Sequence, residues 1–229
     1  MRRARAMPLD EVALLENLDA LASWLREPWV QELIARPGCR VVAAATAASP
    51  DPARGAGGPV SEGAAVDPDR LIFAMQAAGL IRGALFLHEA RGADPAGDAF
   101  HLVVAFGAGV AGHARLVHGG FAAAALDEAA GGLVFELKRA GALGPPASRA
   151  FTARLEVDYR APLPTTATVV VTARLLGIEA GGRKAVVAAE MRDAPGGRLF
   201  AEARALFVTP RAEFFAAGGE AAAGQRSQL

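Results

Sequence analysis

Residues 117–132 have the sequence Val-His-Gly-Gly-Phe-Ala-Ala-Ala-Ala-Leu-Asp-Glu-Ala-Ala-Gly-Gly. This stretch predicts a helix of small apolar residues in which the only acidic groups are Asp127 and Glu128. Buried acids are rare unless they are paired or used in chemistry, so Asp127 is a candidate catalytic residue. Gly119 and Gly120 lie at the predicted helix N-terminus, where unpaired N–H groups can hold a developing negative charge. An oxyanion site and a carboxylate on one helix are the minimum equipment for acyl chemistry.

Each of these features also has a structural interpretation. The glycine pair could serve close packing of the helix start, although two glycines weaken a helix. His118 is open to two interpretations, a hydrogen-bonded cap or a site residue. We expect Glu128 to be a solvated or hydrogen-bonded neighbour of Asp127, because adjacent helical residues point about 100° apart.

The composition limits the class of protein. The chain has 229 residues, of which 52% are apolar and 21% charged, so it can bury a sizeable core in one large domain or a domain with an appendage. Its formal net charge of +0 gives no indication of a nucleic-acid partner or an anionic membrane. Cys39 is the only cysteine, which excludes internal disulfides and cysteine-rich metal sites.

The sequence predicts neither a membrane span nor a targeting segment. No uncharged run reaches the ~18–20 residues that a transmembrane helix needs. Arg2, Arg3 and Arg5 resemble a transit peptide, but acidic residues follow closely, and transit peptides are poor in acids. We therefore expect a cytoplasmic protein, with a mitochondrial or other organellar location as the alternative.

Four regions are predicted along the chain. Residues 1–42 form a helical arm, in which leucines recur at helical spacing up to Leu25 and a second short helix runs from Pro28 through Ile34. Residues 43–69 are rich in Pro, Gly and Ala and predict a linker. The main domain spans 70–210, and residues 211–229 predict a flexible tail. We expect the arm to be an appendage that packs on the main domain.

The main domain is predicted to be α+β. The clearest strand is Phe151–Tyr159, where apolar and polar residues alternate strictly. Hairpin turns are predicted at 179–183 and 193–197, so four strands after the helix should form an antiparallel meander against which the helix packs. The predicted elements are Leu80–Glu89, Phe100–Phe106, the helix His118–Arg139, Phe151–Tyr159, Thr168–Ile178, Lys184–Arg192 and Arg198–Val208.

Three motifs together resemble hotdog-fold acyl-CoA thioesterases, and are most similar to the phenylacetate-pathway type and the eukaryotic thioesterase-superfamily type. They are Val-His-Gly-Gly-Phe-Ala-Ala-Ala-Ala-Leu-Asp-Glu, Phe-Thr-Ala-Arg-Leu-Glu-Val-Asp-Tyr-Arg-Ala-Pro from residue 151, and Gly-Gly-Arg-Lys from residue 181. The resemblance covers roughly residues 80–208. It implies an antiparallel β-sheet wrapped around a long central helix, with active sites formed between two subunits.

The resemblance also implies roles for individual residues. Gly119 matches the residue whose backbone N–H polarises the thioester carbonyl, and Asp127 matches the catalytic carboxylate. Thr152 falls where some members place a water-positioning hydroxyl, and His118 matches a histidine that helps to organise the site. Arg183 and Lys184 are candidates for binding CoA phosphates, or equally solvated charges of a hairpin.

We therefore expect an acyl-CoA thioesterase in which Asp127 acts as general base on water or attacks directly to give an anhydride. No cofactor is expected, since CoA arrives as part of the substrate. The alternatives are a hotdog hydratase or dehydratase and a non-catalytic acyl-CoA-binding protein. Eight helical residues separate Gly119 from Asp127, about 12 Å, so one acyl carbon reaches both groups only if they come from two subunits. We expect a homodimer or a dimer of dimers.

Overall fold

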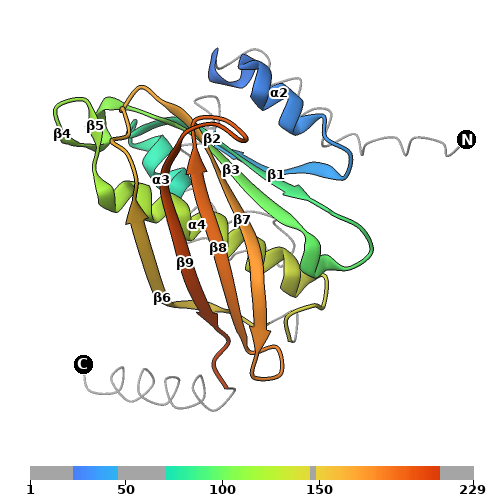
Figure 1. Cartoon of the computed structure of the whole chain (residues 1–229). Helices are drawn as coiled ribbons and strands as arrows, with labels where there is room; N and C mark the ends of the chain where they lie inside the picture. The colour runs from blue at the N-terminus through green and yellow to red at the C-terminus, as the bar shows by residue number, and fades with distance from the viewer. Residues whose placement is uncertain (1–22, 46–70, 145–147, 212–229) are drawn as a thin grey trace, which may run out of the picture.

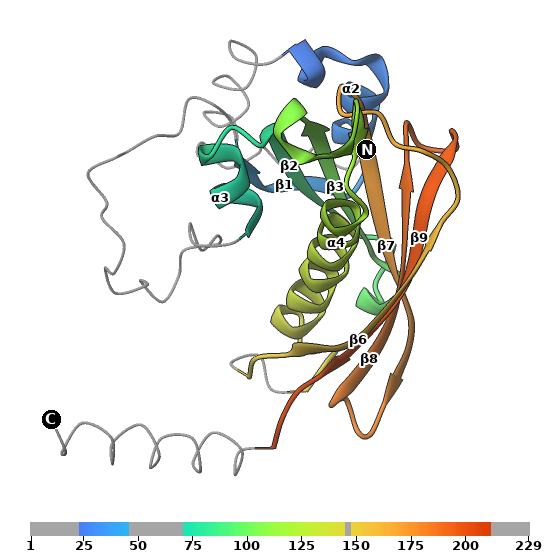
Figure 2. The ribbon, with the colours of Figure 1, turned by 90° about the vertical axis from the view of Figure 1, so that its left-hand side faces the viewer.

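A seven-stranded antiparallel sheet curves around one long helix, α4 (Gly119–Arg139) (Figures 1 and 2). The computed structural model describes residues 23–45, 71–144 and 148–211. The order of the strands across the sheet is β1-β2-β3-β7-β8-β9-β6. The predicted α+β fold, with an antiparallel sheet around a central helix, is confirmed.

The strands of the sheet are β1 (Cys39–Ala45), β2 (Ile81–Glu89), β3 (Ala99–Phe106), β6 (Phe151–Tyr159), β7 (Thr168–Glu179), β8 (Lys184–Arg192) and β9 (Leu199–Val208). The smaller elements are η1 (Ser23–Arg26), α2 (Pro28–Ile34), α3 (Leu71–Ala77), η2 (Pro95–Gly97), η3 (Ala108–Val110), β4 (Ala111–His113) and β5 (Leu116–Val117). Among the described residues, no helix is both long and apolar enough to span a membrane.

The strand pairing corrects the predicted four-stranded meander. β7, β8 and β9 do pair in succession through the two predicted hairpin turns. β6 instead pairs with β9 at the edge of the sheet, and β7 pairs with β3. The alternation in β6 identifies a strand, but a local pattern contains no information about which distant strand becomes its neighbour.

α4 packs into the concave face of the sheet. Leu126, Leu133 and Leu137 are fully buried there, together with aromatic rings from β2 and β3. At Gly132 the helix approaches the sheet so closely that a Cβ atom would lie 2.3 Å from Cε1 of Phe100. Glycine is therefore needed at this position, and the approach fixes the depth of α4 in the sheet.

Part of the opposite face of the sheet is covered by the end of the arm. A second buried cluster joins η1 and α2 to residues of β1, β2, β3 and β7. Its members from the arm are Trp24, Leu25, Val30 and Leu33. Figure 2 shows α2 and α4 on opposite sides of the sheet. The sheet therefore buries apolar residues on both faces, and η1 and α2 form a layer of the domain. α2 lies at its predicted position.

The prediction that the arm is an appendage is therefore wrong for residues 23–45. The predicted arm–linker boundary at residues 42 and 43 falls inside β1, which pairs with β2 from Cys39 to Ala45. β1 was not predicted, because its alanines show no alternation of polar and apolar residues and Pro/Gly-rich sequence follows them. The predicted helix before residue 23, most of the linker and almost all of the tail lie outside the described residues.

Shortening a buried side chain of α2 should destabilise the whole domain. Leu33 is 0% exposed, so Leu33→Ala is expected to lower the free energy of unfolding by about 2–5 kcal/mol. Glu32→Ala, on the exposed side of the same helix, should change it by less than about 0.5 kcal/mol. Urea unfolding of the full chain measures both values. Equal, small effects would restore the view of the arm as an appendage.

Candidate active site

The structure brings Asp127 and Thr152 together from α4 and β6. The Thr152 hydroxyl donates a hydrogen bond to Oδ1 of Asp127 over 2.9 Å. Asp127 is half-buried, and this burial raises the pKa of its carboxyl above the ordinary value, while the hydrogen bond from Thr152 opposes the rise. The result is an ionisable acid that is more basic than a solvated aspartate and is held at one oxygen.

His118 caps the N-terminus of α4. Its ring Nδ1 accepts a hydrogen bond from the backbone N–H of Gly120 over 2.9 Å, and its carbonyl accepts from the N–H of Phe121. The Gly120 N–H, which was predicted to donate to an oxyanion, therefore already donates to the His118 ring. Of the predicted pair, Gly120 is thus already bonded, which corrects that part of the prediction.

The backbone N–H of Gly119 has no hydrogen-bond partner among the described residues. It is the first residue of α4, where the positive end of the helix dipole favours a negative charge. The structure therefore leaves one N–H at this end of the helix available to an acceptor.

Tyr159 is a residue of this region to which the sequence analysis gave no role. It lies at the end of β6, and its hydroxyl donates a hydrogen bond to the Gly119 carbonyl over 2.8 Å. A Cβ atom at position 119 would lie 3.2 Å from the Cζ and Oη atoms of Tyr159, so the absence of a side chain at Gly119 leaves room for the Tyr159 ring. Tyr159 is the only tyrosine of the chain and stands in the Tyr-Arg-Ala-Pro motif, which was the available signal.

Arg183 and Lys184 lie away from the helix N-terminus. Arg183 lines a small hollow beside Lys138, which is in the last turn of α4, whereas Gly119 begins the same helix. A helix of 21 residues is about 30 Å long. The two cations therefore cannot share a site with Gly119 of the same chain.

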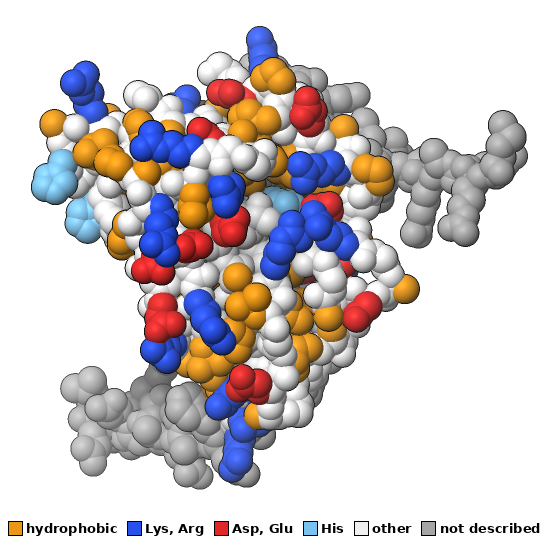
Figure 3. Space-filling view, in the orientation of Figure 1, with side chains coloured by type: hydrophobic (Ala, Val, Ile, Leu, Met, Phe, Trp, Pro, Cys, Tyr) orange, Lys and Arg blue, Asp and Glu red, His pale blue; other side chains and the backbone are white. Residues whose placement is uncertain are grey.

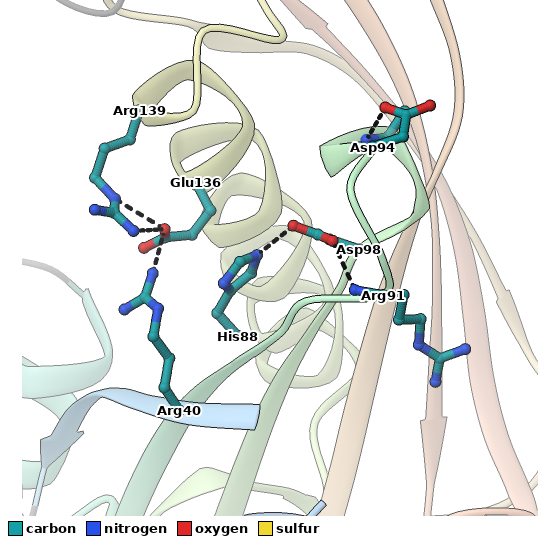
Figure 4. A network of polar contacts seen from close by, with 8 residues as sticks. Arg40, His88, Arg91, Asp94, Asp98, Glu136 and Arg139 are labelled. Atoms are coloured by element: carbon teal, nitrogen blue, oxygen red, sulfur yellow. Dashed lines mark hydrogen bonds and ion pairs between the residues drawn. The ribbon is translucent and has the colours of Figure 1, made fainter. Parts of the chain in front are cut away.

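In a second group of charged residues, the buried carboxylates Glu136 and Asp98 are paired internally (Figure 4). Glu136 of α4 accepts hydrogen bonds from Arg40 of β1 and from Arg139, and His88 lies 2.8 Å from an oxygen of Asp98. These pairs tie the end of α4 to β1 and close the loop after β2. Within the described ranges, no group of three or more His, Cys, Asp or Glu side chains is arranged to hold a metal ion.

One family model matches the part of the chain that contains the candidate residues. The model of the thioesterase superfamily matches residues 115–200, which include α4 and β6. This match confirms the resemblance to hotdog-fold thioesterases that the sequence predicted. A search of curated proteins found no match.

Several solved structures are similar to this chain. A thioesterase superfamily protein is 27% identical, with a TM-score of 0.40, over 54% of this chain and 53% of its own. A phenylacetic acid degradation-related putative thioesterase from Ralstonia eutropha JMP134 is 19% identical, with a TM-score of 0.46, over 64% of this chain and 94% of its own. A protein from Bacillus halodurans, solved with CoA, is 24% identical, with a TM-score of 0.39, over 48% and 66%. The chain thus spans about half the length of the first of these proteins.

Removing the hydroxyl of Thr152 should raise the pKa of Asp127 further, because the hydrogen bond stabilises the ionised carboxylate. Thr152→Val keeps a β-branched residue in the strand, so the fold should survive. Titration of the Asp127 carboxyl by carbon NMR measures the effect. Thr152→Ser, which retains a hydroxyl, is the matched control and should titrate like the wild type. An unchanged titration in Thr152→Val would mean that the hydrogen bond does not act on the carboxylate.

Proposed function

We propose that this chain, whose residues 115–200 match the model of the thioesterase superfamily, hydrolyses acyl-CoA thioesters to a free acid and CoA. The observation that carries the proposal is the half-buried Asp127 carboxylate, which is held by Thr152 and has a raised pKa. A carboxylate of this kind in a helix of small apolar residues has no ion-pair partner among the described residues that would give it a structural role.

Asp127 acts as the general base in this proposal. It accepts a proton from water, the water oxygen bonds to the acyl carbon, and the carbon–sulfur bond breaks as the thiolate leaves and is protonated. The raised pKa supports this role, because a base whose pKa is nearer the working pH removes a proton more effectively. Thr152 orients the carboxylate through its hydrogen bond.

Gly119 supplies the complementary group. Its unpaired N–H at the start of α4 donates to the thioester oxygen as negative charge develops there. His118 fixes the first turn by accepting from Gly120, and Tyr159 holds the Gly119 carbonyl from the other side of the peptide. Both residues thus position the donor without touching the substrate.

The complete site requires two copies of the chain. Gly119 and Asp127 are about 12 Å apart along one helix, too far to act on one carbon. Among the described strands β6 pairs only with β9, so its other edge is open to a further strand, and the exposed side of α4 includes Phe135, which is 51% exposed. A second copy placed along β6 covers this apolar surface and brings its own Gly119 toward Asp127.

The first test is Asp127→Asn, which keeps the shape of the side chain and removes the base. It is expected to reduce thiol release from a panel of acyl-CoA substrates by ~10²–10⁴-fold, as for loss of a general base. The wild-type rate should fall as the pH drops through the pKa of Asp127, which lies above the ordinary value of 3.8.

Glu128→Gln is the matched control and should cost much less activity. Wild-type turnover by Asp127→Asn would remove Asp127 from the chemistry. Tight binding of acyl-CoA without thiol release by the wild-type chain would favour the acyl-CoA-binding alternative, and hydration of an enoyl-CoA would favour the hydratase.

The second test concerns the oligomer. Light scattering should give a homodimer or a dimer of dimers for the wild-type chain. Phe135→Glu places a charge in the proposed interface and is expected to give an inactive monomer. Leu176→Glu, at an exposed position on the other face of the sheet, is the matched control and should keep the wild-type mass. A fully active wild-type monomer would contradict the shared site.

A further inference from the structure

A hollow of about 400 Å³ lies on the face of the sheet opposite α4, beside the buried cluster that α2 forms there. It opens between Arg36, just after α2, the first half of β7, the second half of β8, and the turn from β8 to β9. Figure 3 looks onto this face and shows arginine and lysine side chains gathered with acidic ones over the sheet. The polar and charged residues that line the hollow are Arg36, His101, Thr172, Arg174, Glu190 and Arg192.

The hollow has more positive than negative charge. Three arginines and one glutamate line it, which leaves an excess of two positive charges. Arg192 is engaged with Glu190 over 3.0 Å, and Arg36 lies 3.8 Å from Glu89 beneath the hollow. Arg174 makes no hydrogen bond or ion pair with any residue that the structure describes. Its guanidinium group, with five N–H donors, is available to an anion.

The neighbours of Arg174 add to this positive potential. Partial burial lowers the pKa of its guanidinium most, and the cation Arg91 lowers it further. Glu89 and Glu190 oppose the shift, and Arg36 makes the smallest contribution, which also lowers the pKa. Like charges repel here in the free protein, so a bound anion would relieve the repulsion.

The floor of the hollow is polar and ordered. His101 is 2% exposed and lies 2.9 Å from Glu89 through Nε2 and 2.9 Å from Thr172 through Nδ1. Burial lowers the pKa of His101 to about 4, so the ring is neutral at pH 7. Its one proton faces the Glu89 carboxylate, which can only accept, and Thr172 therefore donates its hydroxyl proton to Nδ1. Oγ1 of Thr172 is left as an acceptor toward the hollow.

We propose that this hollow binds a phosphate monoester that also bears a free hydroxyl group, such as a sugar phosphate. Arg174 pairs with the phosphate oxygens in the bidentate manner of a guanidinium, assisted by Arg36, and Thr172 accepts a hydrogen bond from the ligand hydroxyl. The volume lies in the range of small-molecule sites, about 300–1,000 Å³. The site is separate from the thioester site, since the sheet lies between it and α4.

Isothermal titration calorimetry of the full chain with ribose 5-phosphate tests the proposal. Saturable binding is expected for the wild type, and Arg174→Gln should weaken it at least tenfold. This variant should fold normally, because Arg174 is exposed and loses no hydrogen bond or ion pair with a described residue, and its melting temperature checks that. Arg204→Gln removes an exposed arginine of β9, outside the lining of the hollow, and is the matched control that should bind like the wild type.

Two further arms separate the parts of the ligand. Thr172→Val should weaken binding of ribose 5-phosphate and leave binding of inorganic phosphate unchanged. Inorganic phosphate binding as tightly as ribose 5-phosphate would overturn the assignment to an ester. Absence of saturable binding, or binding unaffected by Arg174→Gln, would overturn the site itself. Asp127→Asn should bind ribose 5-phosphate normally, so failure of the thioesterase proposal and failure of this one are distinguishable.

Discussion

The close packing of α4 against the concave face of the sheet is the contact on which the other features depend. The helix approaches the sheet to the point where position 132 has no room for a Cβ atom beside Phe100. Its leucines fill the space between the rings of β2 and β3 and the inner residues of β7 to β9. A helix fixed at this depth keeps one side half-exposed, and Asp127 lies on that side. Burial of the helix thus determines where the carboxylate meets water.

β6 is fixed to α4 at both of its ends. Thr152 contacts Asp127 near the start of the strand, and Tyr159 contacts Gly119 at its end. The two contacts join the carboxylate and the free N–H to one strand, so that any movement of β6 shifts both groups together. β6 is also one edge of the sheet that the structure describes, so a strand of a second copy that paired with this edge would bear on its position. The proposed dimer and the proposed chemistry therefore depend on the same strand.

The sequence could predict those elements whose signal is local. The length of α4 and the two hairpin turns follow from patterns within a few residues, and a cap was one of the two interpretations of His118. The pairing of β6 with β9 and the role of Tyr159 could not be predicted, because each depends on a contact between residues about 40 or more positions apart. Thr152 was identified only through family resemblance, since nothing in an alternating strand marks one hydroxyl as the partner of a distant carboxylate.

Alternation along β7 places the two proposed sites on opposite faces of one sheet. Val169, Val171 and Ala173 point into the core beneath α4, whereas Val170, Thr172 and Arg174 point to the opposite face. The inner residues are constrained by packing against the helix, and a change of size there disturbs α4. The outer polar residues lie on the other side of the sheet from α4 and from the core that packs against it. Substitution on the outer face can therefore alter what binds there without moving Asp127, because the backbone hydrogen bonds of the sheet hold the strand in register from both sides.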